Sequence, residues 1–229
     1  MRIGVVASSG GAVFEAMQRI LADVHLGRVE WLVVTDRPCG IEDICRERQI
    51  CHARILEPDN ARFSAAAKQF FDDSGGVDFV LLFFLRLVTE ELFLQYPTFN
   101  IHPSLLPAFQ GFNPIRKALR QRVRYLGATL HLAASDADCG PIVAQACMSI
   151  SSDDDEARLN KNSYIQKVGL GLLLYQMIHS GSLQMNSSLT DFEIDAQPVS
   201  DRLNPALTDP ALFKALLSLQ EAENVEVFL

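Results

Sequence analysis

Short apolar runs alternate along the chain with segments in which apolar residues recur at every third or fourth position. The first run covers residues 3–7, and the apolar positions from Val13 to Val24 that follow it fall on one face of a helix. The same alternation continues to residue 102. It predicts strands over residues 3–7, 29–35, 53–56, 79–84 and near 99–102, and helices over 13–24, over 41–49 and from Asn60 to the pair Gly75-Gly76.

This order of strand, helix and strand is typical of an α/β fold. Buried strands joined by crossover helices form a mostly parallel, twisted sheet with helices on both faces. In such a sheet, ligands bind beyond the carboxyl ends of the strands. We therefore expect the functional residues in the loops that follow Ala7, Phe84 and His102.

The second half of the chain is less regular. The pattern predicts a helix over 113–121, strands over 128–134 and 142–150, and a helix over 154–179 that Asp153 and Glu156 cap and Gly181 ends. Residues 186–229 are polar and acidic with weak periodicity. We therefore expect one domain over residues 1–185 and an irregular tail over 186–229 that packs on it, with a short strand near 225–228.

The composition is that of a globular protein. Of the 229 residues, 48% are hydrophobic and 21% are charged, which excludes a largely disordered chain. The net charge of −8 argues against a dedicated surface for nucleic acid or anionic membranes. The longest apolar stretch, residues 79–85, is far shorter than the roughly 20 residues that a membrane span needs. We therefore predict no membrane segment and no nucleic-acid partner.

The five cysteines indicate a reducing compartment, because an odd number in a chain of this length does not suggest a disulfide framework. Cys39, Cys45 and Cys51 lie six residues apart, which is not the spacing of zinc ligands. No signal peptide is visible, since the first apolar run covers only residues 3–7. We therefore predict a cytoplasmic protein without a bound metal, and a homodimer is compatible with the sequence.

The first candidate for chemistry is the loop Ser8-Ser9-Gly10-Gly11, between the first strand and the first helix. Glycines let a ligand approach the backbone, and a helix N-terminus attracts an anion. The loop matches neither the dinucleotide fingerprint nor the P-loop. Phosphate binding at Gly10 and Gly11 and a tight turn without a ligand are equally open.

The second candidate is the end of the strand near residues 99–102. Asn100 and His102 project from the same face, about 6.6 Å apart along the strand. An amide and an imidazole that face one way can donate to one oxygen, which is the geometry of an oxyanion site. From the residue types alone, this interpretation and that of a packed histidine are equally open.

The third candidate is the loop over residues 135–141, which holds Asp136 and Asp138. A carboxylate beside an imidazole raises the pKa of that imidazole and fixes its orientation. Taken alone, the segment favours an ordinary acidic turn.

The second and third candidates belong to a longer set of motifs, which stand in this order along the chain: Asn100-Ile101-His102-Pro103-Ser104-Leu105-Leu106-Pro107, Gly111, Gly127-Ala128-Thr129-x-His131 and Asp138-x-Gly140-Pro141-Ile142-Val143-x-Gln145. With these motifs the chain resembles the folate-dependent formyltransferase family over residues 1 to about 185, and within it the members that formylate phosphoribosylglycinamide. The resemblance implies a Rossmann-like formyltransferase fold with residues 1–185 as the catalytic domain. It implies an enzyme that transfers a formyl group from 10-formyltetrahydrofolate to a small amine. Phosphoribosylglycinamide is the default acceptor, which places the reaction in purine biosynthesis.

The resemblance implies catalytic roles for three residues. Asn100 would hydrogen-bond the formyl oxygen, and protonated His102 would stabilise the oxyanion and donate a proton. Asp138 would keep His102 charged and help to relay the proton of the amine through water. The implied ligand contacts are the backbone of Arg86, Leu87 and Val88 for the pterin ring, the loop 134–140 with Gly140 as the opposite wall, Arg62 near the folate tail, and Gly10 and Gly11 for the acceptor phosphate.

Three departures from the family concern the acceptor and the pterin pocket. Ala12 and Val13 replace side-chain donors of the phosphate loop, Tyr164 and Lys167 replace a glutamine and a glutamate that face the ribose, and Phe83 replaces a small residue. An amino sugar nucleotide or another amine is therefore an alternative acceptor. A hydrolase and a folate-binding module without transfer activity are alternatives with the same fold.

Overall fold

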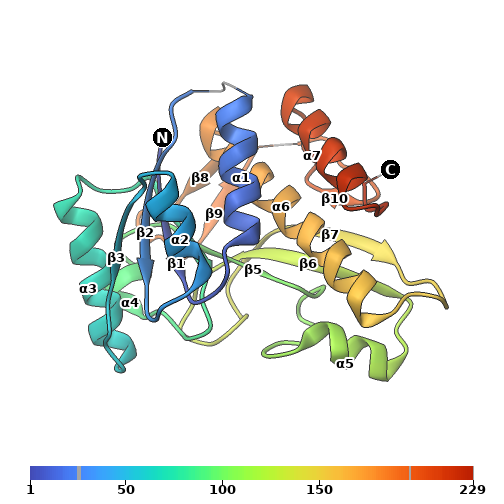
Figure 1. Cartoon of the computed structure of the whole chain (residues 1–229), viewed down its shortest axis with the longest axis horizontal. Coiled ribbons are helices and arrows are strands. Elements are labelled where there is room, and N and C mark those ends of the chain that lie inside the picture. The colour runs from blue at the N-terminus through green and yellow to red at the C-terminus, as the bar shows by residue number, and fades with distance from the viewer. Residues whose placement is uncertain (25–26, 196, 229) are drawn as a thin grey trace. The chain divides into compact units, whose positions relative to one another are not determined.

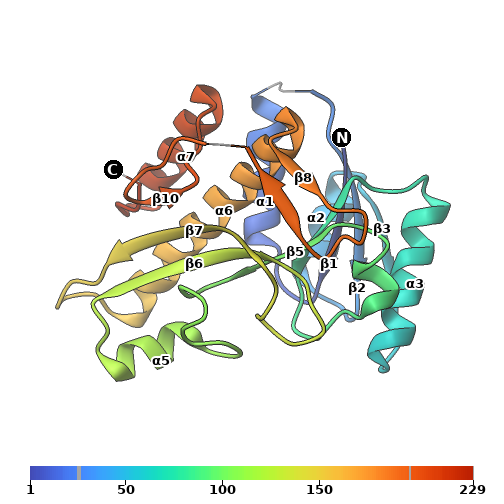
Figure 2. The ribbon, with the colours of Figure 1, turned by 180° about the vertical axis from the view of Figure 1, so that it is seen from behind.

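The computed structural model describes residues 1–24, 27–195 and 197–228 (Figures 1 and 2). By its internal contacts this part of the chain divides into two units. The chain crosses from the first unit to the second between Asn100 and Ile101, inside one strand. The first unit holds Met1–Asn100, Leu132–Pro141 and Met185–Glu193, and the second holds Ile101–His131, Ile142–Gln184 and the described residues from Ile194 onward.

The first unit alternates strands and helices, as predicted. Figure 1 shows α1 and α2 on the near side of β1 and β2. The ends of the predicted elements differ from the observed ones by one or two residues, which is usual for such boundaries. The elements in chain order are β1 (Arg2–Ala7), α1 (Ala12–Asp23), β2 (Glu30–Thr35), α2 (Gly40–Glu47), β3 (Cys51–Arg54), α3 (Asn60–Asp73), β4 (Phe79–Phe83), α4 (Glu90–Phe93) and β5 (Thr98–His102), of which β5 runs on into the second unit.

The order of the strands in the first unit reverses in its middle. β1 pairs with β2 and β4, β2 pairs with β3, and β4 pairs with β5, all in parallel. The resulting order is β5-β4-β1-β2-β3. After β1 the chain moves outward to β2, and after β4 it moves the opposite way to β5. The loops that follow the adjacent strands β1 and β4 therefore run in opposite directions across the sheet. Such a topological switch point is where sheets of this kind bind ligands.

Alternate side chains of these strands pack against helices on opposite faces. Val6 and Leu82 share a core cluster with Phe63 of α3. On the other face, Trp31 of β2 meets Phe14 of α1 edge-on, with ring centroids 5.2 Å apart. Burial of both faces explains the continuous apolar runs in the sequence. The prediction of an α/β fold with a mostly parallel sheet and helices on both faces is confirmed.

The second unit is built on antiparallel strand pairs. β7 pairs with β6 on one side and with β10 on the other. Two further strands, β8 (Leu183–Met185) and β9 (Phe192–Ile194), form a small sheet of their own, and the last residue of β8 and the first two residues of β9 belong to the first unit. Among the helices of the described residues, none combines the length and the apolar character needed to cross a membrane. The elements of the unit are α5 (Pro114–Gln121), β6 (Tyr125–Leu132, whose last residue belongs to the first unit), β7 (Ile142–Ser149), α6 (Glu156–Ser180), β10 (Leu203–Asn204) and α7 (Pro210–Ala222).

The prediction of an irregular tail with a final strand is wrong. The structure has the helix α7 in this segment, and residues 225–228 form no strand. The Asp209 side chain caps α7, and Leu212 and Leu216 are buried along one of its faces. An aspartate followed by proline and a spacing of four between leucines are helix signals. The acidic composition of the segment masked them.

Two predicted helix caps are also corrected. Asp59, rather than Asn60, caps α3 by accepting the Arg62 N–H at 2.9 Å. Asp155, rather than Asp153, caps α6 by accepting the N–H of the residue three positions later at 2.8 Å. Neighbouring aspartates and asparagines cap helices about equally well, so residue type alone does not choose between them.

A buried carboxylate in the first unit makes its stability depend on pH. Glu42 is 2% exposed, accepts the Thr35 hydroxyl at 2.6 Å and binds the Arg54 guanidinium. The Arg54 hydrogen bond is the main reason why the pKa of Glu42 falls from 4.5 to about 2. Because the folded pKa is lowered, this stability is fully present above pH 4.5 and is lost as the pH falls toward 2.

We therefore expect Glu42→Gln to remove about 1–3 kcal/mol of pH-dependent stability. Chemical unfolding between pH 2 and pH 7 measures this, and the wild-type protein should lose more free energy of unfolding on acidification than the variant. Glu47→Gln changes an exposed carboxylate at the end of the same helix and is the control. Equal pH dependence of wild type and Glu42→Gln would contradict the expectation.

Candidate functional site

The loops that leave β1 and β4 are tied together at the switch point of the first unit. The N–H of Ser8 donates to the Phe83 carbonyl at 3.0 Å. The Ser8 hydroxyl accepts the N–H of Leu85 at 3.2 Å. This buried serine therefore fixes the spacing of the two loops in which the sequence predicts ligand contacts.

The loop between β1 and α1 presents backbone at a helix N-terminus. Gly11 is the N-cap of α1 with φ +85°, a left-handed conformation that favours glycine. Gly10 is exposed, and a Cβ there would meet open space. The first N–H groups of a helix have no partner inside it, so the turn from Ala12 can donate them to an anion. The side chains of Ala12 and Val13 supply no donor.

The Arg86 side chain fixes the loop after β4. Its guanidinium donates to the carbonyl oxygens of Glu57 and Pro58 at 2.8 and 2.7 Å, and to Asn60 Oδ1 at 2.8 Å. It also lies over the Phe63 ring, 5.2 Å from the centroid. These contacts occupy its donors within the protein, so the backbone of the segment is the part suited to a ligand. Sequence reasoning missed these partners, because nothing in their spacing marks them.

The other predicted folate contacts differ in their exposure. Leu87 is 43% exposed, whereas Val88 is buried in the core cluster of the first unit. Arg62 is exposed on the first turn of α3, and Phe83 is half-buried at the end of β4. Val88 therefore anchors this segment, and Leu87 offers an apolar surface to a ring.

Asn100 and Asp138, predicted from segments 38 residues apart, meet in the first unit. Asn100 Nδ2 donates to Asp138 Oδ1 at 3.4 Å. A carboxylate only accepts hydrogen bonds, so this contact turns the amide nitrogen rather than the amide oxygen toward Asp138. Such a long hydrogen bond can tighten in a substrate complex. The structure thus brings together two of the three residues predicted to be catalytic.

The loop that carries Asp138 is closed at its base. The N–H of Leu132 donates to the Pro141 carbonyl at 3.0 Å. Gly140 lies so close to the strand end that a Cβ would be 1.9 Å from the Leu132 oxygen. Asp138 has φ 56°, a left-handed conformation that aspartate adopts more readily than most residues. These constraints fix the position from which the carboxylate projects.

We expect Gly140→Ala to destabilise the protein, because its methyl group would overlap a backbone oxygen that cannot move independently. Overpacking of this kind costs typically about 1–3 kcal/mol. Urea unfolding measures the loss. Gly10→Ala adds the same methyl group in open space and should change the free energy of unfolding far less. Equal stability of the two variants would show that the Leu132 oxygen does not constrain the loop.

His102 ends β5 and lies in the second unit, where it is 6% exposed. One residue separates it from Asn100, so the two side chains project from the same face of the strand. His102 Nε2 lies 3.0 Å from the carbonyl oxygen of Phe109. A carbonyl only accepts, so in this contact Nε2 carries a proton and donates it. Sequence reasoning missed the Phe109 carbonyl, because a backbone group leaves no signal in residue type.

α6 carries the departures expected at the acceptor site. Tyr164 and Lys167 are half-buried, and burial lowers the pKa of the Lys167 ammonium. Among the described residues, Asn162 Oδ1, Ser163 Oγ and both amide atoms of Gln166 are buried without a hydrogen-bond partner. Buried polar groups of this kind are normally satisfied by water or a ligand.

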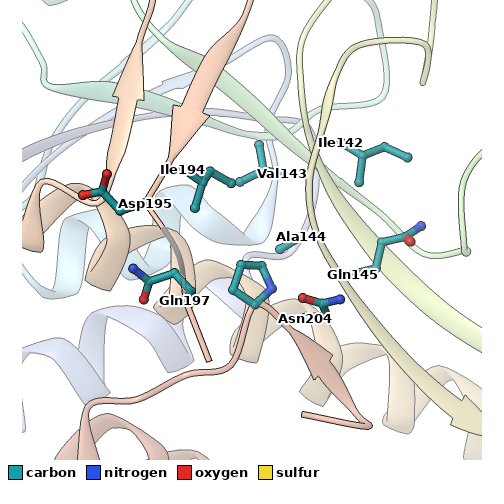
Figure 3. A pocket seen from close by; sticks show the side chains of 9 residues that line it. Ile142, Val143, Ala144, Gln145, Ile194, Asp195, Gln197 and Asn204 are labelled. Carbon is teal, nitrogen blue, oxygen red and sulfur yellow. The ribbon is translucent and has the colours of Figure 1, made fainter. Parts of the chain in front are cut away.

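A cavity of about 410 Å³ opens beside β7 in the second unit (Figure 3). Its described lining includes Ile142, Gln145, Asp195, Gln197 and Asn204, and none of the residues predicted to bind or react. Over the part of the chain that the structure describes, no three His, Cys, Asp or Glu side chains gather as metal ligands do. The described lining of the cavity therefore shares no residue with the predicted site.

The chain is similar to known formyl transferases over most of its length. The formyl transferase family matches residues 1–168. Phosphoribosylglycinamide formyltransferase of Bacillus subtilis (strain 168) is 30% identical over 172 residues, covering 70% of this chain and 87% of that protein. Formyltetrahydrofolate deformylase of Synechocystis sp. is 40% identical over 77 residues, covering 33% of this chain and 27% of that protein. The crystal structure of glycinamide ribonucleotide transformylase 1 from Symbiobacterium toebii is 27% identical with a TM-score of 0.76, covering 86% of this chain and 94% of that one.

These matches confirm the resemblance that the motif runs predict. The matched residues 1–168 include Asn100, His102 and Asp138 as well as the loop of Gly10 and Gly11. The superposition confirms the Rossmann-like fold of these enzymes.

Proposed function

The chain belongs to the formyl transferase family, and we propose that it transfers a formyl group from 10-formyltetrahydrofolate to the amine of phosphoribosylglycinamide. This reaction is a step of purine biosynthesis. The choice of phosphoribosylglycinamide as the acceptor depends on the alignment with the Bacillus subtilis enzyme over 87% of its length. The transformylase from Symbiobacterium toebii supports the same assignment, because its fold covers 86% of this chain.

In the proposed reaction, the amine nitrogen attacks the formyl carbon, and the carbonyl electron pair moves onto the formyl oxygen. Asn100 Nδ2–H and the protonated His102 ring donate to that oxyanion. Preorganised donors of this kind stabilise the transition state more than the ground state. The intermediate then breaks the bond between the carbon and N10 of the folate, and the new amide forms.

One proton must leave the amine and one must reach N10 of the folate for the reaction to balance. We assign the first transfer to Asp138, acting through water, and the second to His102 Nδ1. The Asn100–Asp138 contact supports this arrangement, because it fixes the carboxylate beside the proposed oxyanion donor.

We further propose which residues hold the two substrates. The backbone of Arg86, Leu87 and Val88 and the loop that ends at Gly140 would bind the pterin ring. The proposed role of that backbone is supported by the Arg86 guanidinium, which is held by neighbouring carbonyl groups. The remaining assignments are Arg62 for the folate tail, Gly10 and Gly11 for the acceptor phosphate, and residues 1–185 as the catalytic domain.

Two specific observations favour alternatives at the acceptor step. The deformylase from Synechocystis sp. is 40% identical over 77 residues, which favours hydrolysis of the same formyl donor. Ala12 and Val13 lack the polar side chains expected around a phosphate, and Lys167 brings a cation to α6, which favours another amine such as an amino sugar nucleotide.

The test combines the purified protein with 10-formyltetrahydrofolate and phosphoribosylglycinamide and follows the folate product and the formylated acceptor separately. Formylated acceptor in equal amount to the tetrahydrofolate supports transfer. Tetrahydrofolate with free formate and no need for an acceptor would replace the proposal by hydrolysis. Release that only an amino sugar nucleotide stimulates would replace the acceptor. Folate binding with no release in any mixture would leave a binding module.

Location and assembly stay predictions. We propose a cytoplasmic enzyme without a nucleic-acid partner, supported by the net charge of −8 and by the redox argument from five cysteines. A homodimer is the assembly to test, by sedimentation of the full chain.

A further inference from the structure

The loop over residues 103–109, which follows His102, is held by one buried hydroxyl group. Thr129 Oγ1 donates to the Ser104 carbonyl at 2.7 Å. It accepts the N–H of Leu106 at 3.0 Å and Nε2–H of Gln145 at 3.0 Å. A hydroxyl has one proton and two lone pairs, so these three bonds use its whole capacity. Thr129 is 0% exposed, and water therefore cannot replace them.

Two further contacts extend this hold along the loop. Gln145 Nε2 also donates to the Leu106 carbonyl at 3.0 Å. The Ser104 hydroxyl donates to the Ala108 carbonyl at 2.5 Å. Alternate loop residues 104, 106 and 108 are thus fixed, either to β6 and β7 or to one another. Figure 3 shows the Gln145 amide across the cavity from Asp195.

The hydrogen bonds within the loop over residues 103–109 place the Phe109 carbonyl beside the His102 imidazole. Phe109 has φ 58°, a left-handed conformation that is uncommon for a residue with a large side chain. Such a conformation persists only where the surrounding structure enforces it. The residue before it is the one that the Ser104 hydroxyl holds. The Phe109 carbonyl then lies 3.0 Å from His102 Nε2.

We propose that Thr129 and Gln145 are positioning residues for the transfer reaction. By holding the loop, they keep the Phe109 carbonyl on Nε2–H of His102, which fixes the orientation of the ring and its tautomer. This inference rests on the proposed function of His102. Neither residue touches the reacting atoms in this assignment, and both act through the backbone.

The first test compares Thr129→Val with Thr129→Ser. Valine keeps the shape of threonine and removes all three hydrogen bonds, whereas serine keeps the hydroxyl. A misplacement of about 1 Å can cost about 10² in rate, so we expect Thr129→Val to lower kcat by about 10- to 100-fold. KM for 10-formyltetrahydrofolate should change less than about threefold, and Thr129→Ser should stay within about threefold of wild type in kcat. Thr208→Val, which changes an exposed threonine, is the control.

The second readout does not need activity. Nitrogen-15 NMR of the imidazole, assigned with a His102→Ala sample, distinguishes a ring protonated on Nε2 from one protonated on Nδ1. In spectra recorded where the imidazole is neutral, wild type and Thr129→Ser should carry its single proton on Nε2. Thr129→Val should show a mixture of tautomers. If the protein proves not to be a transferase, this measurement still tests the positioning.

Gln145→Leu is the second variant, and it keeps the test decisive if Thr129→Val does not fold. Gln145 is half-buried at the cavity edge, so its replacement disturbs less of the core. Gln197→Leu changes another lining residue of the same cavity and is the matched control. A fall in kcat of about tenfold with a changed tautomer supports the proposal. An unchanged His102 spectrum in a folded variant, or a loss confined to KM, would overturn it.

Discussion

The His102→Ala variant should lose turnover by about 10²–10⁴-fold, because one substitution removes both an oxyanion donor and the proton donor. His102 is 6% exposed and its Nε2 is held by the Phe109 carbonyl, so the ring is ordered before substrate arrives. Binding of tetrahydrofolate should change only a few-fold, since the proposed pterin contacts lie on other segments. Steady-state assays and equilibrium binding of tetrahydrofolate measure the two quantities.

His52→Ala is the matched control for this variant. The His52 ring also contacts a backbone carbonyl, with Nδ1 3.0 Å from the Ile50 oxygen, but it lies on β3 outside the predicted site. We expect its turnover to stay near that of wild type. Thermal unfolding of both variants separates loss of the imidazole from loss of the fold. Turnover of a folded His102→Ala protein within a few-fold of wild type would remove His102 from the mechanism.

The parallel part of the fold could be predicted because both faces of its strands are buried. Runs such as residues 79–84 are continuously apolar, and the helices between them carry a single apolar face. The prediction of an irregular tail was wrong because little of that segment is buried. α7 buries only a narrow leucine stripe within an acidic segment, and composition outweighed the capping signal at Asp209.

The candidate site could be predicted only as far as side chains define it. Asn100 and Asp138 carry distinctive chemistry, and the structure places them 3.4 Å apart. The backbone contacts that hold these side chains in place have no signal in the sequence. The Phe109 carbonyl that binds His102, and the carbonyl groups that hold Arg86, are backbone atoms that every residue type supplies. Their function depends on the path of the chain, which residue identity at one position does not encode.

Asn100→Ala is the second variant with a large expected effect. Loss of a single oxyanion donor typically lowers kcat by about 10²–10³-fold, so the effect should be smaller than or equal to that of His102→Ala. Asn100→Asp should be at least as slow, for a different reason. It would place a second carboxylate where the amide nitrogen now meets Asp138 Oδ1 at 3.4 Å. Two like charges at this distance cannot both ionise without cost, and neither donates to an oxyanion.

Kinetics of the Asn100 variants distinguish an oxyanion donor from a residue that only orients Asp138. If Asn100 acts through Nδ2–H, both variants lose kcat, and KM for the amine changes little. Asn160→Ala, on the exposed surface of α6, is the control and should keep wild-type kinetics. If Asn100 only orients Asp138, Asn100→Ala should lower kcat no further in a protein that already carries Asp138→Ala. Equal kcat of the Asp138→Ala variant and of the double variant would therefore assign Asn100 to positioning and contradict its role as an oxyanion donor.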